Sequence, residues 1–332
     1  RRWAKDRRFQ VGLRVMRGRV SARESGHMLS DLAEALMAAL LPRVEADFAE
    51  TFGRVPGSEF AVVALGKLGA RELTSGSDLD LVFLYNAPDL KASSDGARPV
   101  APATYFARLS QRLLGALSAQ TAESALFEVD MRLRPSGSAG PIATSVPAFL
   151  EYHRGKAWTW EHLALTRARV VVAPPGFAER LQGEIRAVLA APRNPEELLR
   201  DVAEMRERVE REKGSANVWR VKYVRGGLVD LEFLAQYLML LHAHAHPDLP
   251  TGDTALAYDR LAAAGILEAD LAARLRDAVL QTRGIQAFLR ECYLDDLDED
   301  AAPETLKAAL ARSAGAKSFA ELRERVAATE AS

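Results

Sequence analysis

The chain has 332 residues, and its 44 basic and 45 acidic residues leave a net charge of −1. Charges that cancel in this way give no long-range attraction to nucleic acid or to an anionic membrane, so we expect neither as a partner. A single cysteine excludes an internal disulfide and a thiolate metal cluster, and it is typical of a reducing cytoplasm, where we expect the protein to act.

The first half of the chain predicts a helix followed by strands. The chain begins without Met inside a predicted helix, so we expect it to be part of a longer polypeptide. Apolar residues at helical spacing from 20 to 52 predict one long amphipathic helix. Two short apolar runs predict buried strands at 60–65 and 79–85. A third strand is predicted at 126–133, where charged and apolar residues alternate, and a helix is predicted over 103–119.

The second half predicts mostly helix. The pattern is helical over most of 146–189, and Ala191 to Pro195 forms the clearest linker. We therefore expect an α+β chain of two domains. A mixed-sheet domain with flanking helices spans 1–190, including an N-terminal helical segment of about 1–55, and an all-α helical bundle spans 191–332.

Two aspartates open the second predicted strand. Successive side chains of a strand point to opposite faces, so Asp78 and Asp80 share one face while Leu79 points to the other. Two carboxylates on one face form half of a magnesium site, because Mg²⁺ prefers about six oxygen ligands and takes several of them from carboxylates and substrate phosphates.

Asp130 is the candidate third carboxylate. Alternation along the third predicted strand places Glu128, Asp130, Arg132 and Arg134 on one face and apolar residues on the other. For this segment taken alone, a solvated edge strand explains the charges equally well. Together with the first two aspartates, the pattern favours a metal site of Asp78, Asp80 and Asp130.

These residues suit chemistry on a nucleoside triphosphate. Transfer of a nucleotidyl group depends mainly on positioning and charge neutralisation, and two metal ions can hold the attacking and leaving oxygens in line. We expect two Mg²⁺ ions as cofactors and a nucleoside triphosphate as substrate. The predicted phosphate ligands are two glycines where the backbone can approach closely and four polar side chains, namely Gly66, Gly69, Lys67, Ser77, Arg132 and Arg134.

The same stretches resemble the polymerase β-like nucleotidyltransferases and, within them, the glutamine synthetase adenylyltransferases. In the superfamily a glycine turn precedes an Asp-x-Asp strand, and a third acidic residue lies on a later strand. Lys67 stands where the superfamily has a serine. The similar blocks extend through nearly the whole chain and include GKLGAREL (66–73), SGSDLDLVFLY (75–85), LFEVDMRLRPSGSAGPIATS (126–145), AWTWEHLALTRARVV (157–171) and VKYVRGGLVDLEFLAQYL (221–238).

This resemblance implies an enzyme that regulates nitrogen assimilation. Enzymes of this family have two similar halves, of which the first removes AMP from glutamine synthetase and the second attaches it. The blocks DMRLRPSG (130–137) and AWTWEH (157–162) resemble the second half. The implied reaction transfers an adenylyl group from ATP to a tyrosine of glutamine synthetase and releases pyrophosphate, under the control of the PII signal protein and of glutamine. Asp130 can also help to take the proton of the tyrosine.

Four further residues are candidates for the active cleft. Glu161 lies in a tryptophan-rich block that either frames the nucleotide or forms a buried aromatic cluster. Lys222, Asp230 and Glu232 surround a glycine pair that begins a helix. They either reach the cleft or cap the helix and form ion pairs.

Two other functions stay open from the sequence. Phosphorolytic removal of AMP from modified glutamine synthetase would use the same carboxylates. A nucleotide-sensing regulatory domain without turnover is the non-catalytic alternative, and the presence of all three carboxylates argues against it.

Overall fold

The computed structural model describes residues 1–122, 125–292, 294 and 296–331. The chain divides into two compact units. The sheet unit consists of Arg1–Lys5, Ser30–Ala70 and Ser77–Leu189, and the helical unit consists of Asp6–Leu29, Arg71–Gly76 and the chain from Ala190 onward. The domain bounds expected from the sequence, 1–190 and 191–332, remain a proposal.

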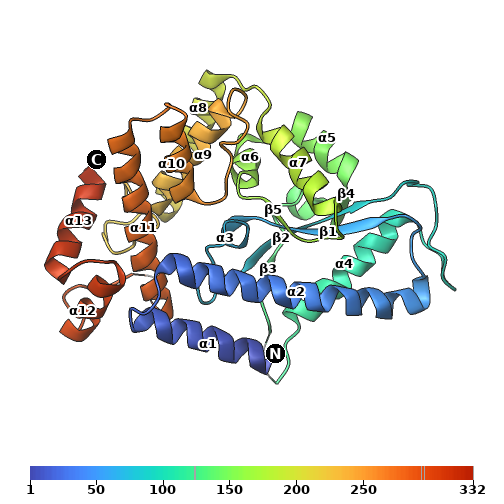
Figure 1. Ribbon diagram of the computed structural model, residues 1–332, viewed down its shortest axis with the longest axis horizontal. Helices are drawn as coiled ribbons and strands as arrows, with labels where there is room; N and C mark the ends of the chain where they lie inside the picture. The colour runs from blue at the N-terminus through green and yellow to red at the C-terminus, as the bar shows by residue number, and fades with distance from the viewer. Residues whose placement is uncertain (123–124, 293, 295, 332) are drawn as a thin grey trace. The chain divides into compact units, whose positions relative to one another are not determined.

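The sheet unit is built on a mixed sheet (Figure 1). Its strands are β1 (Glu59–Ala64), β2 (Leu79–Asn86), β3 (Val129–Asp130), β4 (Ala143–Ser145) and β5 (Arg169–Val172). The order is β3-β2-β1-β5, with β4 also paired to β2. β1 is antiparallel to β2 and β5, whereas β3 and β4 run parallel to β2. Both parallel partners therefore lie on the same edge of β2.

Helices cover both faces of this sheet. The helices of the unit are α3 (Gly66–Gly69), α4 (Pro102–Ser118), α5 (Val146–Gly155), α6 (Thr159–Leu165) and α7 (Phe177–Leu189), with the 3₁₀ turn η1 (Gly137–Ala139). In Figure 1, α5 and α7 cover one face and α4 the other. Phe106 of α4 stacks on Phe60 and Tyr85, with ring centroids 5.7 and 4.5 Å apart. Because side chains alternate along β2, Asp80 belongs to the face opposite Tyr85.

The first two predicted strands are confirmed, but the third was predicted too long. Only Val129 and Asp130 pair with β2, and residues 131–134 form turns. Arg132 and Arg134 therefore do not continue the strand alternation from Asp130. The prediction of mostly helix between 146 and 189 also missed β5, which pairs with β1.

The helical unit is built from α8 (Pro195–Lys213), α9 (Leu228–His242), α10 (Thr254–Ala263), α11 (Ala269–Glu291), α12 (Glu304–Ser313) and α13 (Phe319–Ala331). One apolar cluster joins α9, α10 and α11 around Tyr258, which is fully buried. A second cluster joins α11, α12 and α13 around Trp219. The predicted α+β class, a mixed-sheet domain followed by helices, is confirmed.

Two N-terminal helices, α1 (Arg2–Met16) and α2 (Ala22–Phe52), have residues in both units. The bounds of α2 confirm the long helix predicted from the sequence. Ser21 caps α2, since its backbone N–H donates to Glu24 and its hydroxyl accepts from the Glu24 N–H. Among the helices that the structure describes, none combines the length and the apolar character needed to span a membrane.

Candidate metal centre

The register of β2 and β3 brings three aspartates together. Asp80 is the second residue of β2 and is paired with Asp130, the last residue of β3. Leu79 N–H donates to the Glu128 carbonyl at 2.9 Å and fixes this register. Neighbouring residues of paired strands project to the same face, so the two carboxylates converge, and Asp78 joins them from the end of the preceding loop. One carboxylate oxygen of each aspartate lies within 4.8 Å of the other two.

The three carboxylates repel one another. Asp80 is the most enclosed, and burial together with the charges of Asp78 and Asp130 raises its pKa to about 6. Asp130 shows the opposite shift, because hydrogen bonds from Arg132 hold the pKa of its carboxyl below the usual range. The raised pKa of Asp80 means that negative charge is unfavourable in this cluster. A bound cation would relieve that repulsion, so the cluster is electrostatically suited to bind one.

Arg132 is the exposed cation of the centre. Its backbone N–H donates to Asp130 at 2.8 Å, its Nε donates at 2.7 Å, and its Nη2 forms an ion pair with the same carboxylate. The Arg132 side chain is nevertheless 81% exposed. A guanidinium with so much free surface can exchange part of this pairing for a phosphate oxygen.

Arg167 is a buried cation that was not among the predicted site residues. It is 8% exposed, and its charge acts on Asp80 to lower that pKa, against the larger effects of burial and of the other carboxylates. Its place in the block AWTWEHLALTRARVV (157–171), two residues after the end of α6, was the available signal in the sequence.

Gly66 makes room for the Asp80 carboxylate. Its φ of +51° lies in the left-handed region, and a Cβ at this position would lie 1.9 Å from Asp80 Oδ2. The Leu65 N–H donates to the Asp80 carbonyl at 2.9 Å and ties the turn to β2. At Gly69 a Cβ would lie 2.0 Å from the Arg167 carbonyl oxygen. Gly66 therefore allows the turn to pack against the Asp80 carboxylate, and Gly69 allows it to pack against the backbone of Arg167. The phosphate contacts expected of both glycines stay a prediction.

Lys67 and Ser77 lie together beside these residues. Lys67 Nζ donates to Ser77 Oγ at 3.5 Å, and both residues are partly buried. Ser77 directly precedes Asp78. The structure therefore groups one cationic and one hydroxyl side chain just before β2, and their role in phosphate binding stays a prediction.

Arg134 has a different set of contacts from the one implied by strand alternation. Its guanidinium donates to the carbonyls of Gly140 at 3.2 Å, Met131 at 2.8 Å and Ser138 at 3.1 Å. These bonds hold the loop after β3. A phosphate-binding role for Arg134 stays a prediction, and it would have to displace some of them.

Glu161 is buried and holds the start of α6. Its carboxylate accepts from the Trp158 N–H at 2.8 Å and from the Tyr152 hydroxyl at 2.9 Å. Trp158 and Trp160 are 71% and 41% exposed, so the expected alternative of a buried aromatic cluster is wrong for these two side chains. The contacts of Glu161 with the protein are those of a helix cap.

The remaining candidates lie in the helical unit. Asp230 forms an ion pair with Arg206, and it accepts from the Gly226 N–H at 2.7 Å, which ties the glycine pair to the first turn of α9. A Glu232 oxygen lies 3.8 Å from Arg283 Nη2, and Lys222 Nζ lies 5.0 Å from the ring centre of Tyr223. Ion pairing, part of one of the two expected accounts, therefore describes the contact of Asp230 with Arg206 within this unit.

The donor set of the three aspartates fits Mg²⁺. All the donor atoms are carboxylate oxygens, the ligands that this hard cation prefers, and one side chain is open to solvent where phosphates and water can complete six-fold coordination. No cysteine or histidine belongs to the group, which disfavours zinc.

Known proteins resemble the chain along its whole length. The family described as Glutamate-ammonia ligase adenylyltransferase matches residues 1–184, and the family described as PII-uridylyltransferase matches residues 196–331. Three curated relatives carry the name "Bifunctional glutamine synthetase adenylyltransferase/adenylyl-removing enzyme". They come from Rhodopseudomonas palustris strain TIE-1 (43% identity over 97% of the chain), Bradyrhizobium diazoefficiens (42% over 97%) and Xanthobacter autotrophicus (42% over 100%). The chain spans about a third of their lengths, namely 32%, 32% and 34%.

Proposed function

Because the chain belongs to the glutamate-ammonia ligase adenylyltransferase family, we propose that it transfers an adenylyl group from ATP to a tyrosine of glutamine synthetase and releases pyrophosphate. The observation that carries this proposal is the convergence of Asp78, Asp80 and Asp130 at the paired ends of β2 and β3. Of the two activities in the names of the relatives, the sequence blocks around Asp130 and Glu161 favour attachment.

The three aspartates would hold Mg²⁺, in our proposal two ions. Bound Mg²⁺ would neutralise charge on the triphosphate and hold the reacting oxygens in line. The chain's own contribution is to keep three carboxylates on one face despite their repulsion. Asp80 is held by the β2–β3 register and by the space at Gly66, so it needs little reorganisation to act as a ligand.

Cations around the carboxylates would bind the phosphates. Arg132 is exposed beside Asp130, and it can turn toward a phosphate while Asp130 accepts the metal. Lys67 and Ser77 would supply further donors at the start of β2. We propose that Asp130, whose lowered pKa keeps it ionised, also helps to accept the proton of the attacking tyrosine.

The partners follow from the same proposal. Glutamine synthetase is the protein substrate, and the PII signal protein and glutamine are the proposed regulators of a cytoplasmic enzyme. The match of residues 196–331 to a uridylyltransferase of PII supports a link between the helical unit and PII signalling. Nucleic acid is not a proposed partner, because the net charge of −1 offers no electrostatic attraction to it.

Labelled ATP tests the reaction. The purified chain is incubated with unmodified glutamine synthetase, Mg²⁺ and ATP labelled at the α-phosphate. We expect label on a tyrosine of the synthetase, and a loss of at least a hundredfold in the variants Asp78→Asn and Asp130→Asn. Asp47→Asn, an exposed residue of α2, is the matched control and should transfer normally. Transfer that survives loss of either site aspartate would remove the proposed metal centre.

Removal of AMP is the second candidate, because the relatives' name contains both activities. Adenylylated glutamine synthetase carrying label is incubated with the chain and inorganic phosphate. Release of labelled ADP, together with no labelling of the unmodified synthetase, would reverse the proposed direction.

A further inference from the structure

The segment Arg71–Gly76 joins α3 to β2 and belongs to the helical unit, although the residues on either side of it belong to the sheet unit. Asp78 follows the end of this segment by two positions and Asp80 by four. Any contact that fixes the segment therefore also restrains the backbone from which two of the three carboxylates project.

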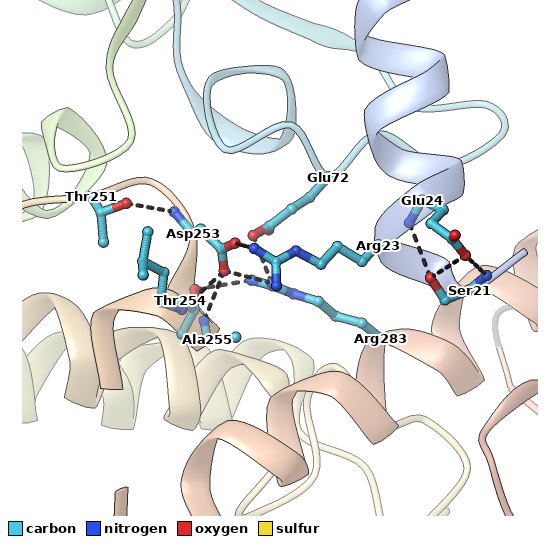
Figure 2. A network of polar contacts seen from close by, with 10 residues as sticks. Ser21, Arg23, Glu24, Glu72, Thr251, Asp253, Thr254, Ala255 and Arg283 are labelled. Carbon is cyan, nitrogen blue, oxygen red and sulfur yellow. Dashed lines mark hydrogen bonds and ion pairs between the residues drawn. The ribbon is translucent and has the colours of Figure 1, made fainter. Parts of the chain in front are cut away.

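A largely buried ion pair between two partly exposed side chains holds the beginning of the segment. Nη1 of Arg283, on α11, lies 2.6 Å from a carboxylate oxygen of Glu72, and the two side chains are only 13% and 14% exposed. Figure 2 shows Glu72 and Arg283 approaching each other. An ion pair that is largely shielded from solvent is screened little by salt, so this contact favours a single position of Glu72.

A hydrogen bond to the same helix holds the end of the segment. The Ser75 hydroxyl donates to Glu291 Oε1 at 2.6 Å. Glu291 follows Arg283 by eight residues on α11, which is slightly more than two helical turns. The segment is therefore attached to one rigid helix at two separate points.

The backbone of the segment is restrained as well. Arg71 and Gly76, its first and last residues, have φ values of 61° and 72° in the left-handed region. A non-glycine residue there costs about 1 kcal/mol and persists where the surrounding structure holds it. At Gly26 of α2 a Cβ would lie 2.9 Å from the Arg71 carbonyl oxygen, so α2 packs directly against this residue.

Arg283 also connects the segment to the packing of the helical unit. Its Nη2 donates to Thr254 Oγ1 at 2.9 Å, and its Nη1 lies 3.9 Å from Oδ1 of Asp253, the N-cap residue of α10. Asp253 in turn pairs with Arg23 of α2 at 2.9 Å (Figure 2). The Arg283 guanidinium thus links α10 and α11 to the segment that leads into the carboxylates, and α2 joins this network through Arg23 and Asp253.

We infer that Arg283 and Glu291 are positioning residues for the metal centre: α11 fixes the segment Arg71–Gly76 and thereby the place at which Asp78 and Asp80 begin β2. The catalytic consequence rests on the proposed function, whereas the positioning itself does not. A change in the packing of α11 would accordingly alter metal affinity without touching a ligand.

The test uses the full chain and two readouts. The first is hydrogen exchange at the Leu79 amide, which donates to Glu128 and reports the β2–β3 register, with Val63 of β1 as the internal reference. The second is the dissociation constant of Mn²⁺ alone. Arg283→Met should accelerate Leu79 exchange about tenfold, leave Val63 unchanged and weaken Mn²⁺ binding about tenfold.

Controls separate positioning from general loss of stability. Arg276 also lies on α11, and Arg276→Met removes its ion pairs with Asp259 of α10 and with Asp277. Both readouts should stay within twofold of the unmodified chain. Arg283→Lys keeps the positive charge, so it should restore most of the Leu79 protection and most of the Mn²⁺ affinity that Arg283→Met loses. Ser75→Ala removes only the second attachment, and it should change both readouts in the same direction by a smaller factor. It serves as the test if Arg283→Met does not fold.

The outcomes distinguish this inference from the proposed function. Unchanged Leu79 exchange and Mn²⁺ affinity in folded Arg283→Met, or in Ser75→Ala if that variant alone folds, would overturn the positioning role even if adenylyl transfer is observed. If the unmodified chain neither transfers AMP nor binds Mn²⁺, the proposed function fails, and the exchange of Leu79 still decides whether α11 positions β2.

Discussion

Replacing Asp80 with asparagine should stabilise the metal-free protein at neutral pH. The pKa of Asp80 rises from 3.8 to about 6, chiefly because burial and the charges of Asp78 and Asp130 disfavour its ionised form. A raised carboxyl pKa means that the folded state binds the proton more tightly than the unfolded state. Stability is therefore lost as the pH rises between these two values, and the full penalty is present above about pH 6.

The shift sets the expected magnitude. One pKa unit corresponds to 1.36 kcal/mol, so a shift from 3.8 to about 6 implies a penalty of up to about 3 kcal/mol. Asp80→Asn removes it. Urea unfolding in the presence of a chelator should show a gain of about 1–3 kcal/mol at pH 8 and no gain at pH 3.5, whereas Asp47→Asn should change neither value. Mg²⁺ should then stabilise the unmodified chain more than the variant. An equal effect of Asp80→Asn at both pH values, or a loss of stability at pH 8, would refute the electrostatic reasoning.

Three other substitutions test separate parts of the structure. Gly66→Ala places a Cβ 1.9 Å from Asp80 Oδ2 and should weaken Mn²⁺ binding at least tenfold in a calorimetric titration. Tyr258→Phe removes a buried hydrogen bond of 2.7 Å to the Leu231 carbonyl, and it should lower the free energy of unfolding by about 1 kcal/mol in urea without changing metal affinity. Burial lowers the pKa of His153 from 6.5 to about 4, so the unfolded state binds the proton more tightly. The free energy of unfolding should therefore fall by up to about 3 kcal/mol as the pH falls from 6.5 to 4. His153→Gln should remove that part of the acid sensitivity in a pH series of thermal unfolding.

The sequence predicted the carboxylate cluster because the relevant rules are local. Alternation along a short apolar strand places Asp78 and Asp80 on one face, and the observed register pairs Asp80 with Asp130. The length of the third strand was not predictable from alternation, because the loop after Asp130 is held by the guanidinium of Arg134, whose three carbonyl partners replace strand pairing.

Two other features had weaker signals. The run Arg169–Val172 ends in three valines, a β-branched pattern typical of a strand, but it lies among helical segments, and its pairing with β1 is a long-range property. Glu161 accepts from the N–H of Trp158, the N-cap residue of α6. A tryptophan stands there in place of the Ser or Thr that usually marks a capping box in a sequence.

The attachment of Arg71–Gly76 to α11 lies beyond sequence reasoning of this kind. Ser75 and Glu291 are 216 positions apart, and neither residue belongs to a motif that indicates the other. Only the folded helical unit shows that a six-residue loop beside the carboxylates is held by a helix from the last quarter of the chain.

The most direct measurement of the central claim is an anomalous diffraction map of crystals soaked with Mn²⁺ and a non-hydrolysable ATP analogue. We predict a metal peak within about 2.5 Å of carboxylate oxygens of Asp78, Asp80 and Asp130, with the triphosphate beside Arg132. A peak away from these aspartates, or nucleotide bound elsewhere with the three carboxylates unliganded, would contradict the account.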